Sequence, residues 1–214
     1  MALEIERKYI DVEMDPLRKR LMDAGAKCEE EAHFESNLVF DTADRKLFAT
    51  GRLLRLRMQE WPQRTRFVLT AKMASANQAA NIKIRQEEET EIADGPTMKA
   101  ILEQLGYLAV ARYEKVRESW HLQGKYGAAI IDMDTLPFGN VVEIECQAEA
   151  MDAVASMLGL SAYMASAETY YDLGKKWQIS RGMSPESDLV FEESQKKHIR
   201  TNLGIPNSDS SAYL

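Results

Sequence analysis

Cysteine and long apolar runs are both scarce in this chain of 214 residues. Neither Cys28 nor Cys146 belongs to a Cys-x-x-Cys pair, which argues against a disulfide framework, a zinc site and a dithiol redox centre. No apolar run approaches the roughly 20 residues that are needed to cross a bilayer. The acidic start also lacks the basic and apolar regions of a signal peptide. These absences predict a cytoplasmic protein without a membrane partner.

An excess of positive charge is absent as well. The chain has 34 acidic and 27 basic residues, and its formal net charge is -7. Proteins that bind nucleic acids usually carry a basic surface that neutralises backbone phosphates, so we expect no nucleic-acid partner. A phosphate-rich ligand would have to meet basic residues that are concentrated locally.

Several familiar catalytic motifs are missing too. The sequence contains no Gly-x-x-x-x-Gly-Lys loop and no Gly-x-Gly-x-x-Gly turn, which argues against a P-loop or Rossmann mode of nucleotide binding. The three histidines, His33, His121 and His198, show neither metal-ligand spacing nor a partnered nucleophile.

Charged and apolar residues alternate along many segments, which is typical of strands, because the side chains of a strand alternate between its two faces. In the opening segment, Glu4, Glu6 and Lys8 would therefore share one face. Other predicted extended segments are 27–40, 54–57, 67–72, 82–89, 113–122, 128–134 and 141–146, and a loop is predicted at 73–81.

Apolar residues at helical spacing predict helices near residues 16–24, 97–105, 150–158 and 167–177. About eight strands with hairpin-length links favour a closed barrel, because closure removes exposed strand edges. We therefore expect an α+β fold, an eight-stranded antiparallel β-barrel with helices packed on its outside. Residues 1–177 would form this domain, and the polar segment 178–214 would be a tail that is partly helical or flexible.

The alternating strands bring together one set of charged residues. The basic members are Lys8, Arg55, Arg57, Lys72, Arg85, Lys115 and Arg117, and the acidic members are Glu4, Glu6, Glu87, Glu89, Asp132, Asp134, Glu143 and Glu145. In one interpretation, these charges face water and their apolar neighbours fill the barrel, which is the commoner arrangement. In the other, the charges face the lumen and the apolar residues lie beneath the helices, which need an apolar face to pack against.

A lumen lined by charges would have to be wide and hydrated, because unpaired buried charge is very costly. It would also have to bind a highly charged ligand. Inorganic triphosphate, or the triphosphate of a larger molecule, fits this requirement: Arg and Lys would hold its oxygens, and carboxylates would hold Mg²⁺ or Mn²⁺.

Several ordered motifs resemble those of the CYTH, or triphosphate tunnel metalloenzyme, superfamily. They are Glu4-x-Glu6-x-Lys8, Leu54-Arg55-Leu56-Arg57, Thr70-x-Lys72, Arg85-x-Glu87-x-Glu89, Lys115-x-Arg117, Asp134 followed by Pro137 and Gly139, and Glu143-Ile144-Glu145. The later Thr169-Tyr170-Tyr171-Asp172-Leu173 is similar to the family's C-terminal helix signature. The resemblance spans residues 3 to about 177, and the ordered combination is more specific than any single motif.

The resemblance implies an eight-stranded tunnel that binds a triphosphate together with Mg²⁺ or Mn²⁺. By motif position, it implies that Glu4, Glu6, Lys8 and Glu145 are catalytic. It assigns metal binding to Glu4, Glu6 and Glu145, with Glu87, Glu89, Asp134 and Glu143 as further or water-mediated ligands. Phosphate binding would fall to Lys8, Arg55, Arg57, Lys72, Arg85, Lys115 and Arg117.

Four functions remain open on this basis. We favour metal-dependent hydrolysis of inorganic triphosphate by an activated water, because this substrate needs no pocket for a base or sugar. A class IV adenylyl cyclase is the second candidate, although only three residues precede Glu4 and His33-Phe34 does not match the family's His-Phe pair. A thiamine triphosphatase, with Trp61 or Trp120 stacking on the ligand, is the third. The fourth is a polyphosphate or nucleotide binding module without turnover. The sequence also leaves a homodimer open.

Overall fold

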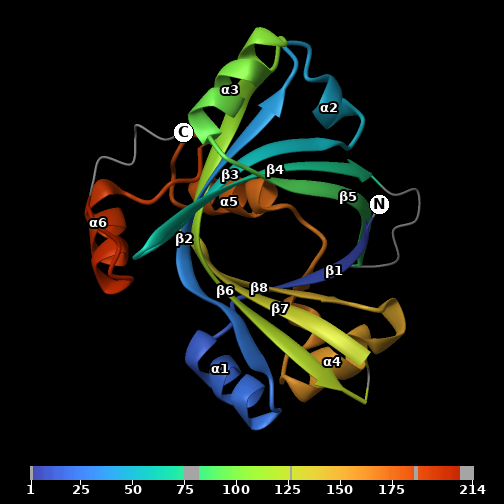
Figure 1. Cartoon of the computed structure of the whole chain (residues 1–214). Helices are drawn as coiled ribbons and strands as arrows, with labels where there is room; N and C mark the ends of the chain where they lie inside the picture. Colours follow the sequence, from blue (N-terminus) through green and yellow to red (C-terminus); the bar gives the residue numbers. More distant parts are fainter. Residues whose placement is uncertain (1, 75–81, 126, 186–187, 208–214) are drawn as a thin grey trace.

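A computed structural model of the chain describes residues 2–74, 82–125, 127–185 and 188–207 (Figure 1). The strands are β1 (Ala2–Ile10), β2 (Lys27–Asp41), β3 (Leu53–Trp61), β4 (Arg64–Ala74), β5 (Lys83–Ile92), β6 (Leu108–Gly124), β7 (Gly127–Leu136), β8 (Gly139–Cys146) and β9 (Ala165–Ser166). The α-helices are α1 (Met14–Asp23), α2 (Lys46–Ala49), α3 (Gly95–Gln104), α4 (Met151–Met157), α5 (Tyr170–Ser180) and α6 (Glu193–Asn202). No helix in these ranges is long and apolar enough to cross a membrane.

The first eight strands form a closed antiparallel barrel, which confirms the predicted fold class. The order β5-β4-β3-β2-β6-β7-β8-β1 closes because β1 pairs with both β8 and β5. The short strand β9 adds to β1. In this register Glu6 lies opposite Glu145, and Glu4 lies opposite Arg85. Charged residues that are far apart in the sequence therefore face each other across neighbouring strands.

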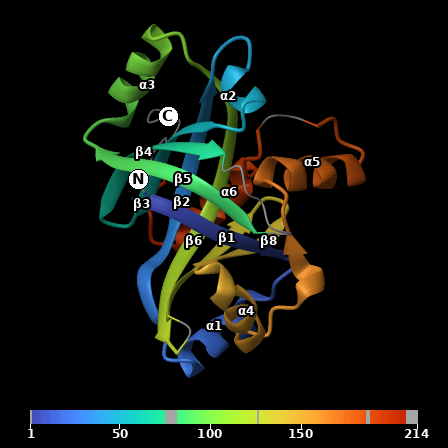
Figure 2. The same cartoon turned by 90° about the vertical axis from the view of Figure 1, so that its right-hand side faces the viewer.

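The apolar faces of the strands lie outside the barrel, beneath the helices. Ile131 and Ile144 pack in one cluster with Leu17 and Leu21 of α1 and Met151 of α4. A second cluster joins β2 and β3 to α3. Figures 1 and 2 show α1 and α4 at one end of the molecule and α3 at the opposite end. The charges therefore face the lumen, and the interpretation that placed them toward water is wrong.

The predicted helices are present, with shifted boundaries. Helix α5 begins three residues later than predicted because Thr169 caps it: its hydroxyl accepts a hydrogen bond from the Asp172 amide, and the Asp172 carboxylate accepts one from the Thr169 amide. Helix α1 ends before Gly25, whose φ of 77° suits glycine. Most of the predicted 73–81 loop, residues 75–81, lies outside the described residues.

The chain beyond α5 returns to the barrel wall. Residue 177 lies within α5, and α6 packs on the outside near β2 and β3 (Figure 1). Phe191 and Ile205 form an apolar cluster with Phe34 of β2. Arg200 of α6 pairs with Glu60 of β3 at 2.7 Å. Residues 191–205 are thus packed on the barrel, and the predicted division at residue 177 stays a prediction.

Candidate functional site

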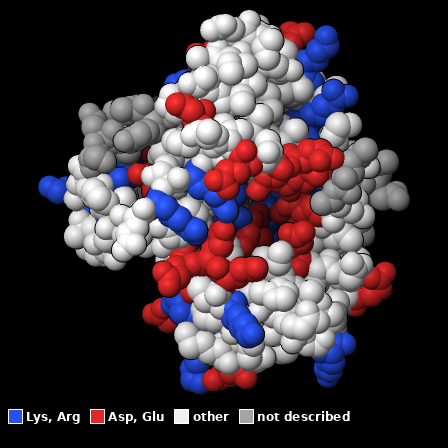
Figure 3. Space-filling model, viewed as in Figure 1, with Lys and Arg blue, Asp and Glu red and all other residues white. Residues whose placement is uncertain are grey.

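A cavity of about 940 Å³ occupies the inside of the barrel. All the predicted site residues line it except Asp134, which is fully buried. Figure 3 shows acidic side chains gathered around a hollow, with basic side chains within it. The strand alternation accounts for this arrangement, because every second residue of each strand points inward. The roles assigned to these residues stay predictions.

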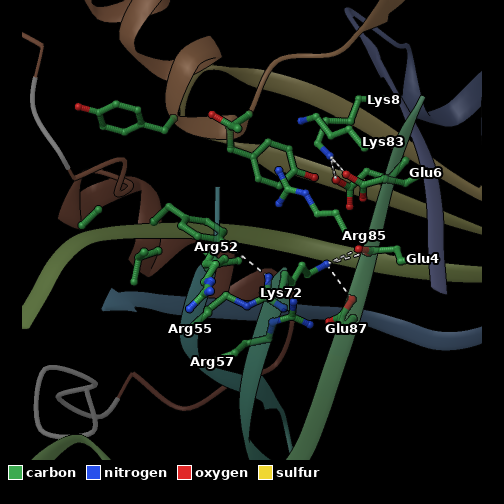
Figure 4. Close-up of a pocket in the computed structure, with 18 of the residues that line it drawn as sticks. Glu4, Glu6, Lys8, Arg52, Arg55, Arg57, Lys72, Lys83, Arg85 and Glu87 are labelled. Carbon is green, nitrogen blue, oxygen red and sulfur yellow. Dashed lines mark hydrogen bonds and ion pairs between the residues drawn. The ribbon is translucent and has the colours of Figure 1, made fainter. Parts of the chain in front are cut away.

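Lys72 of β4 joins two carboxylates at one part of the cavity (Figure 4). Its ammonium donates hydrogen bonds to both oxygens of Glu4, at 2.7 and 2.8 Å, and pairs with Glu87 at 2.9 Å. Burial raises the pKa of Glu4, with help from Glu6 and Glu87 and against the attraction of Lys72. The pKa of Glu87 is lowered, because the attraction of Lys72 outweighs burial. This lysine is thus shared between acids that repel each other.

A second group centres on Lys8 of β1. Its ammonium lies 2.7 Å from Glu6 and 2.6 Å from Glu143. Burial opposes the charge on Lys8, but the two carboxylates outweigh it and raise its pKa. Burial likewise opposes ionisation of Glu143, yet Lys8 and Arg117 hold its pKa well below the usual value. These groups therefore stay charged inside the barrel.

Asp134 is buried next to residues that line the cavity and orients two of the cations. It accepts hydrogen bonds from Lys115 at 3.1 Å, from Arg117 at 2.7 and 2.5 Å, and from the Tyr170 hydroxyl at 2.5 Å. Both carboxylate oxygens are thus engaged. Burial opposes its ionisation, but Arg117 and Lys115 lower its pKa. In this arrangement Asp134 positions cations that line the cavity.

Glu35 of β2 is a buried carboxylate that the sequence analysis missed. It lies 3.5 Å from Arg57 and 3.4 Å from Lys115, two predicted phosphate-binding residues on different strands. Gln59 donates a hydrogen bond to it at 2.8 Å. Burial disfavours the charged form, but Arg57 and Lys115 keep its pKa well below the usual value. The only signal in the sequence was its position in the predicted extended segment 27–40. In the structure Glu35 faces Lys115 across the β2–β6 pair.

Lys83 of β5 is a second residue that was missed, although it precedes Arg85 by two positions and shares its face. It lines the cavity, and its ammonium donates a hydrogen bond to the Glu168 carbonyl at 2.9 Å. Burial, reinforced by the positive charge of Lys8, lowers its pKa to about 8. Figure 4 shows Lys83 next to Lys8 and Glu6.

The aromatic residues of the cavity also differ from those considered in the sequence. Trp61 stacks on His33 with ring centroids 4.3 Å apart, and the Trp120 indole donates a hydrogen bond to Glu118 at 2.8 Å. Neither tryptophan lines the cavity, so neither is placed to stack on a ligand bound there. The aromatic residues that line it are Phe40, Phe48, Tyr113, Tyr170 and Tyr171.

The donor chemistry of one part of the cavity suits a divalent cation. Glu145 forms no salt bridge with any described residue, and burial together with Glu4 and Asp132 raises its pKa to about 7. Such a surplus of negative charge is what a hard cation offsets. Within the described ranges, no three acidic, histidine or cysteine side chains already converge on one point. Lys72 and Lys8 hold Glu4 and Glu6 instead, so a cation would have to compete with these lysines.

Glu145→Gln is expected to stabilise the metal-free protein at pH 8. Folded Glu145 keeps its proton up to about pH 7, whereas the unfolded chain releases it near 4.5. The unfolded chain binds fewer protons in this window, so the free energy of unfolding falls as the pH rises through it. Glutamine does not titrate, so the variant avoids this fall in the free energy of unfolding. We put the gain at pH 8 at about 2 kcal/mol after allowance for the partial exposure of the side chain. Thermal unfolding in EDTA between pH 5 and pH 8 measures this effect.

The control for this substitution is Glu149→Gln, which removes one exposed carboxylate just beyond β8. The gain for Glu145→Gln should be small at pH 5 and should grow towards pH 8. An equal melting temperature for wild type and Glu145→Gln at pH 8 would contradict the assignment of a raised pKa to this residue.

Known structures share this barrel. A "putative adenylate cyclase" from Vibrio parahaemolyticus superposes with a TM-score of 0.67 at 22% identity, covering 80% of this chain and 97% of that one. A conserved hypothetical protein from Pyrococcus furiosus gives 0.65 at 22% identity, with 79% and 99% covered. A "putative adenylyl cyclase" from Hippeastrum, described as having a dominant triphosphatase activity, gives 0.55 at 17% identity, with 84% and 96% covered. At these identities the similarity shows the fold alone.

The sequence comparison carries the assignment further. No curated protein sequence matches the chain significantly. The CYTH domain family, however, matches residues 2–161, which include all eight barrel strands and every predicted site residue. The chain therefore belongs to the CYTH domain family.

Proposed function

We propose that this protein hydrolyses a triphosphate with the help of a divalent cation, and that inorganic triphosphate is its substrate. The observation that carries the proposal is the single cavity in which Lys8, Arg55, Arg57, Lys72, Arg85, Lys115 and Arg117 converge with carboxylates. A dense set of cations matches the several charges of a triphosphate, and the accompanying acids would be unfavourable for the binding of an anion alone. A binding module without turnover is therefore less well supported.

The cations of the cavity are already oriented for binding. Arg55 donates hydrogen bonds to the Tyr113 hydroxyl at 3.0 Å and to Thr70 at 3.2 Å, and Arg57 donates one to Asn37 at 3.2 Å. Side chains that are held in this way lose less entropy when they bind a ligand. Phosphoryl transfer depends mainly on such positioning and on electrostatic stabilisation. We assign phosphate binding to this set.

Glu4, Glu6 and Glu145 would hold the divalent cation, with Glu87 beside them, because these acids lie in the part of the cavity with surplus negative charge. Mg²⁺ and Mn²⁺ both prefer such oxygen ligands. When bound, the cation would offset phosphate charge and lower the pKa of a water molecule.

Direct attack by water fits the residues that line the cavity. Among the described residues that line it, there is no serine, cysteine or histidine. A covalent intermediate on one of these common nucleophiles is therefore not part of the proposal. Lys8 is held between Glu6 and Glu143 and would supply a fixed positive charge next to the transferred phosphoryl group.

A second candidate is the reaction of an organic triphosphate, as in an adenylyl cyclase or a thiamine triphosphatase. Part of the cavity wall is apolar, with contributions from Phe40, Phe48, Leu53 and Val110. The volume of about 940 Å³ leaves space beyond a triphosphate for an organic group. The description of the Hippeastrum protein names both activities, which supports keeping both candidates. In either case the proposed ligand is a small molecule.

A substrate screen separates these candidates. We expect orthophosphate release from inorganic triphosphate in the presence of Mg²⁺ or Mn²⁺, and none in EDTA. ATP and thiamine triphosphate are tested in parallel, with readouts for both orthophosphate and cyclic AMP. Cyclic AMP as the main product from ATP would favour the cyclase. Tight binding of triphosphate without any product over hours would favour a binding module and contradict the proposal.

A further inference from the structure

The segment after α5 completes part of the barrel wall, although it lies beyond the residues that match the family, 2–161. Strand β6 pairs with β7 only from Val116 onward, so the first part of β6 has a free edge there. Leu189 pairs with Tyr113 on that edge in parallel orientation. Its amide donates to the Arg112 carbonyl at 2.8 Å, and its carbonyl accepts from the Glu114 amide at 3.0 Å.

Buried contacts hold this segment in place. The Phe191 amide donates a hydrogen bond to Glu114 at 3.1 Å, and Lys196 pairs with Glu114 at 3.0 Å. At the other end of α6, Arg200 pairs with Glu60, and both side chains are less than 10% exposed. Pairs that are this well buried are costly to break. The position of Leu189 is therefore defined by its own hydrogen bonds to β6 and by these contacts, which follow it in the chain.

The Leu189 side chain lies between α5 and the cavity. It is 3% exposed and forms part of the cavity lining. It packs directly on Gly174 of α5: a Cβ atom at residue 174 would lie 2.4 Å from one Leu189 methyl carbon and 2.5 Å from the other. A glycine at this position lets α5 approach Leu189 closely. A methyl group at residue 174 would therefore have to displace Leu189, α5 or both.

Two tyrosines of the cavity lie on the elements that Leu189 touches. Tyr113 of β6 accepts a hydrogen bond from Arg55, and Tyr170 of α5 donates one to Asp134. The two rings lie 6.0 Å apart. Asp134 in turn orients Lys115 and Arg117. The spacing between α5 and β6 thus affects three of the proposed phosphate-binding side chains.

We propose that Leu189 is a positioning residue for triphosphate binding. It sets the separation of α5 from β6 and thereby places Tyr113 and Tyr170 where they orient Arg55, Lys115 and Arg117. The segment 188–205 then belongs to the catalytic unit. This inference rests on the proposed triphosphatase function.

The test introduces a methyl group against Leu189 and then removes the obstruction. In Gly174→Ala, the new methyl group should push Leu189 and α5 apart and raise KM for inorganic triphosphate about tenfold, with a smaller change in kcat. Alanine favours a helix over glycine, so the helix itself is not weakened. In the double variant Gly174→Ala/Leu189→Ala, space is restored, and KM should return to within about threefold of wild type. Ile179→Ala, at an exposed position of α5, is the matched control.

The full chain is used for all variants, and melting temperatures are measured beside the kinetics. If Leu189 has a purely structural role, Gly174→Ala and the double variant should both lower the melting temperature while KM stays the same. This result would overturn the inference. A double variant with a KM as high as that of Gly174→Ala would do so too. If the wild-type protein shows no metal-dependent hydrolysis of inorganic triphosphate, the proposed function itself fails, which is a distinguishable outcome.

Discussion

Glu4→Gln is expected to lower the rate of metal-dependent triphosphate hydrolysis about 100-fold or more while the protein stays folded. The substitution removes one charge from the carboxylates proposed to hold the divalent cation. It keeps the size of the side chain and its position on β1. The measurement is kcat with inorganic triphosphate over a range of Mg²⁺ and Mn²⁺ concentrations, together with the melting temperature in EDTA.

The structure indicates why the fold should tolerate this change. Lys72 loses Glu4 as a charged partner but keeps Glu87 at 2.9 Å. Burial and the neighbouring acids raise the pKa of Glu4, so ionisation of this residue is less favourable in the folded protein than in the unfolded chain. Loss of the charge should therefore cost little free energy of unfolding, whereas the site for the cation is lost.

The matched control is Glu103→Gln, an exposed carboxylate on α3 that does not line the cavity. Its rate should equal that of the wild type. Glu6→Gln should behave like Glu4→Gln. An unchanged metal-dependent rate in both Glu4→Gln and Glu6→Gln would remove these residues from the proposed cation site.

Asp134→Ala is expected to destabilise the protein by about 3 kcal/mol or more. Asp134 is fully buried and accepts hydrogen bonds from Lys115, Arg117 and Tyr170. Without its carboxylate, two buried cations lose a shared counter-charge. A loss of this size corresponds to a fall in melting temperature of roughly 10 °C for a chain of this length. Thermal and denaturant unfolding measure it.

Asp132 provides the comparison, because it lies two residues away on the same strand and also pairs with Arg117, at 2.6 Å. Burial and the nearby acids Asp134 and Glu143 raise the pKa of Asp132, so its charged form is less favourable than that of Asp134. Asp132→Ala should therefore cost clearly less. Equal losses for the two variants would show that Asp134 is not the principal counter-charge of Lys115 and Arg117.

The predicted and observed sites agree where the strand pattern is strongest. In β1, β3 and β5 two or more charged residues follow one another at alternate positions, so the shared face could be predicted before any pairing was known. Glu35 was missed because most charges of β2 lie together near its start, in Glu29-Glu30-Glu31, and the residues around Glu35 do not alternate between charged and apolar. Its importance comes from Arg57 and Lys115, which belong to β3 and β6 and meet it only after these strands pair with β2.

Contacts between residues distant in the sequence account for the other differences. The polar composition of the chain after residue 177 favoured a tail. The division at residue 177 stays a prediction, but residues 189–205 pack on the barrel, because a few of them, among them Leu189, Phe191 and Arg200, find partners on β6, β2 and β3. Composition averages over a segment and does not show such single contacts.

The sequence by itself determined that the strands have one charged and one apolar face, and that helices with apolar stripes accompany them. Those features depend on local periodicity, which each segment carries alone. Only the tertiary structure decided that the charged faces line the lumen, which acid pairs with which base, and that Lys72 and Asp134 each serve several partners. Charge pairing depends on distance in space, and barrel closure sets that distance between residues that are far apart in the chain.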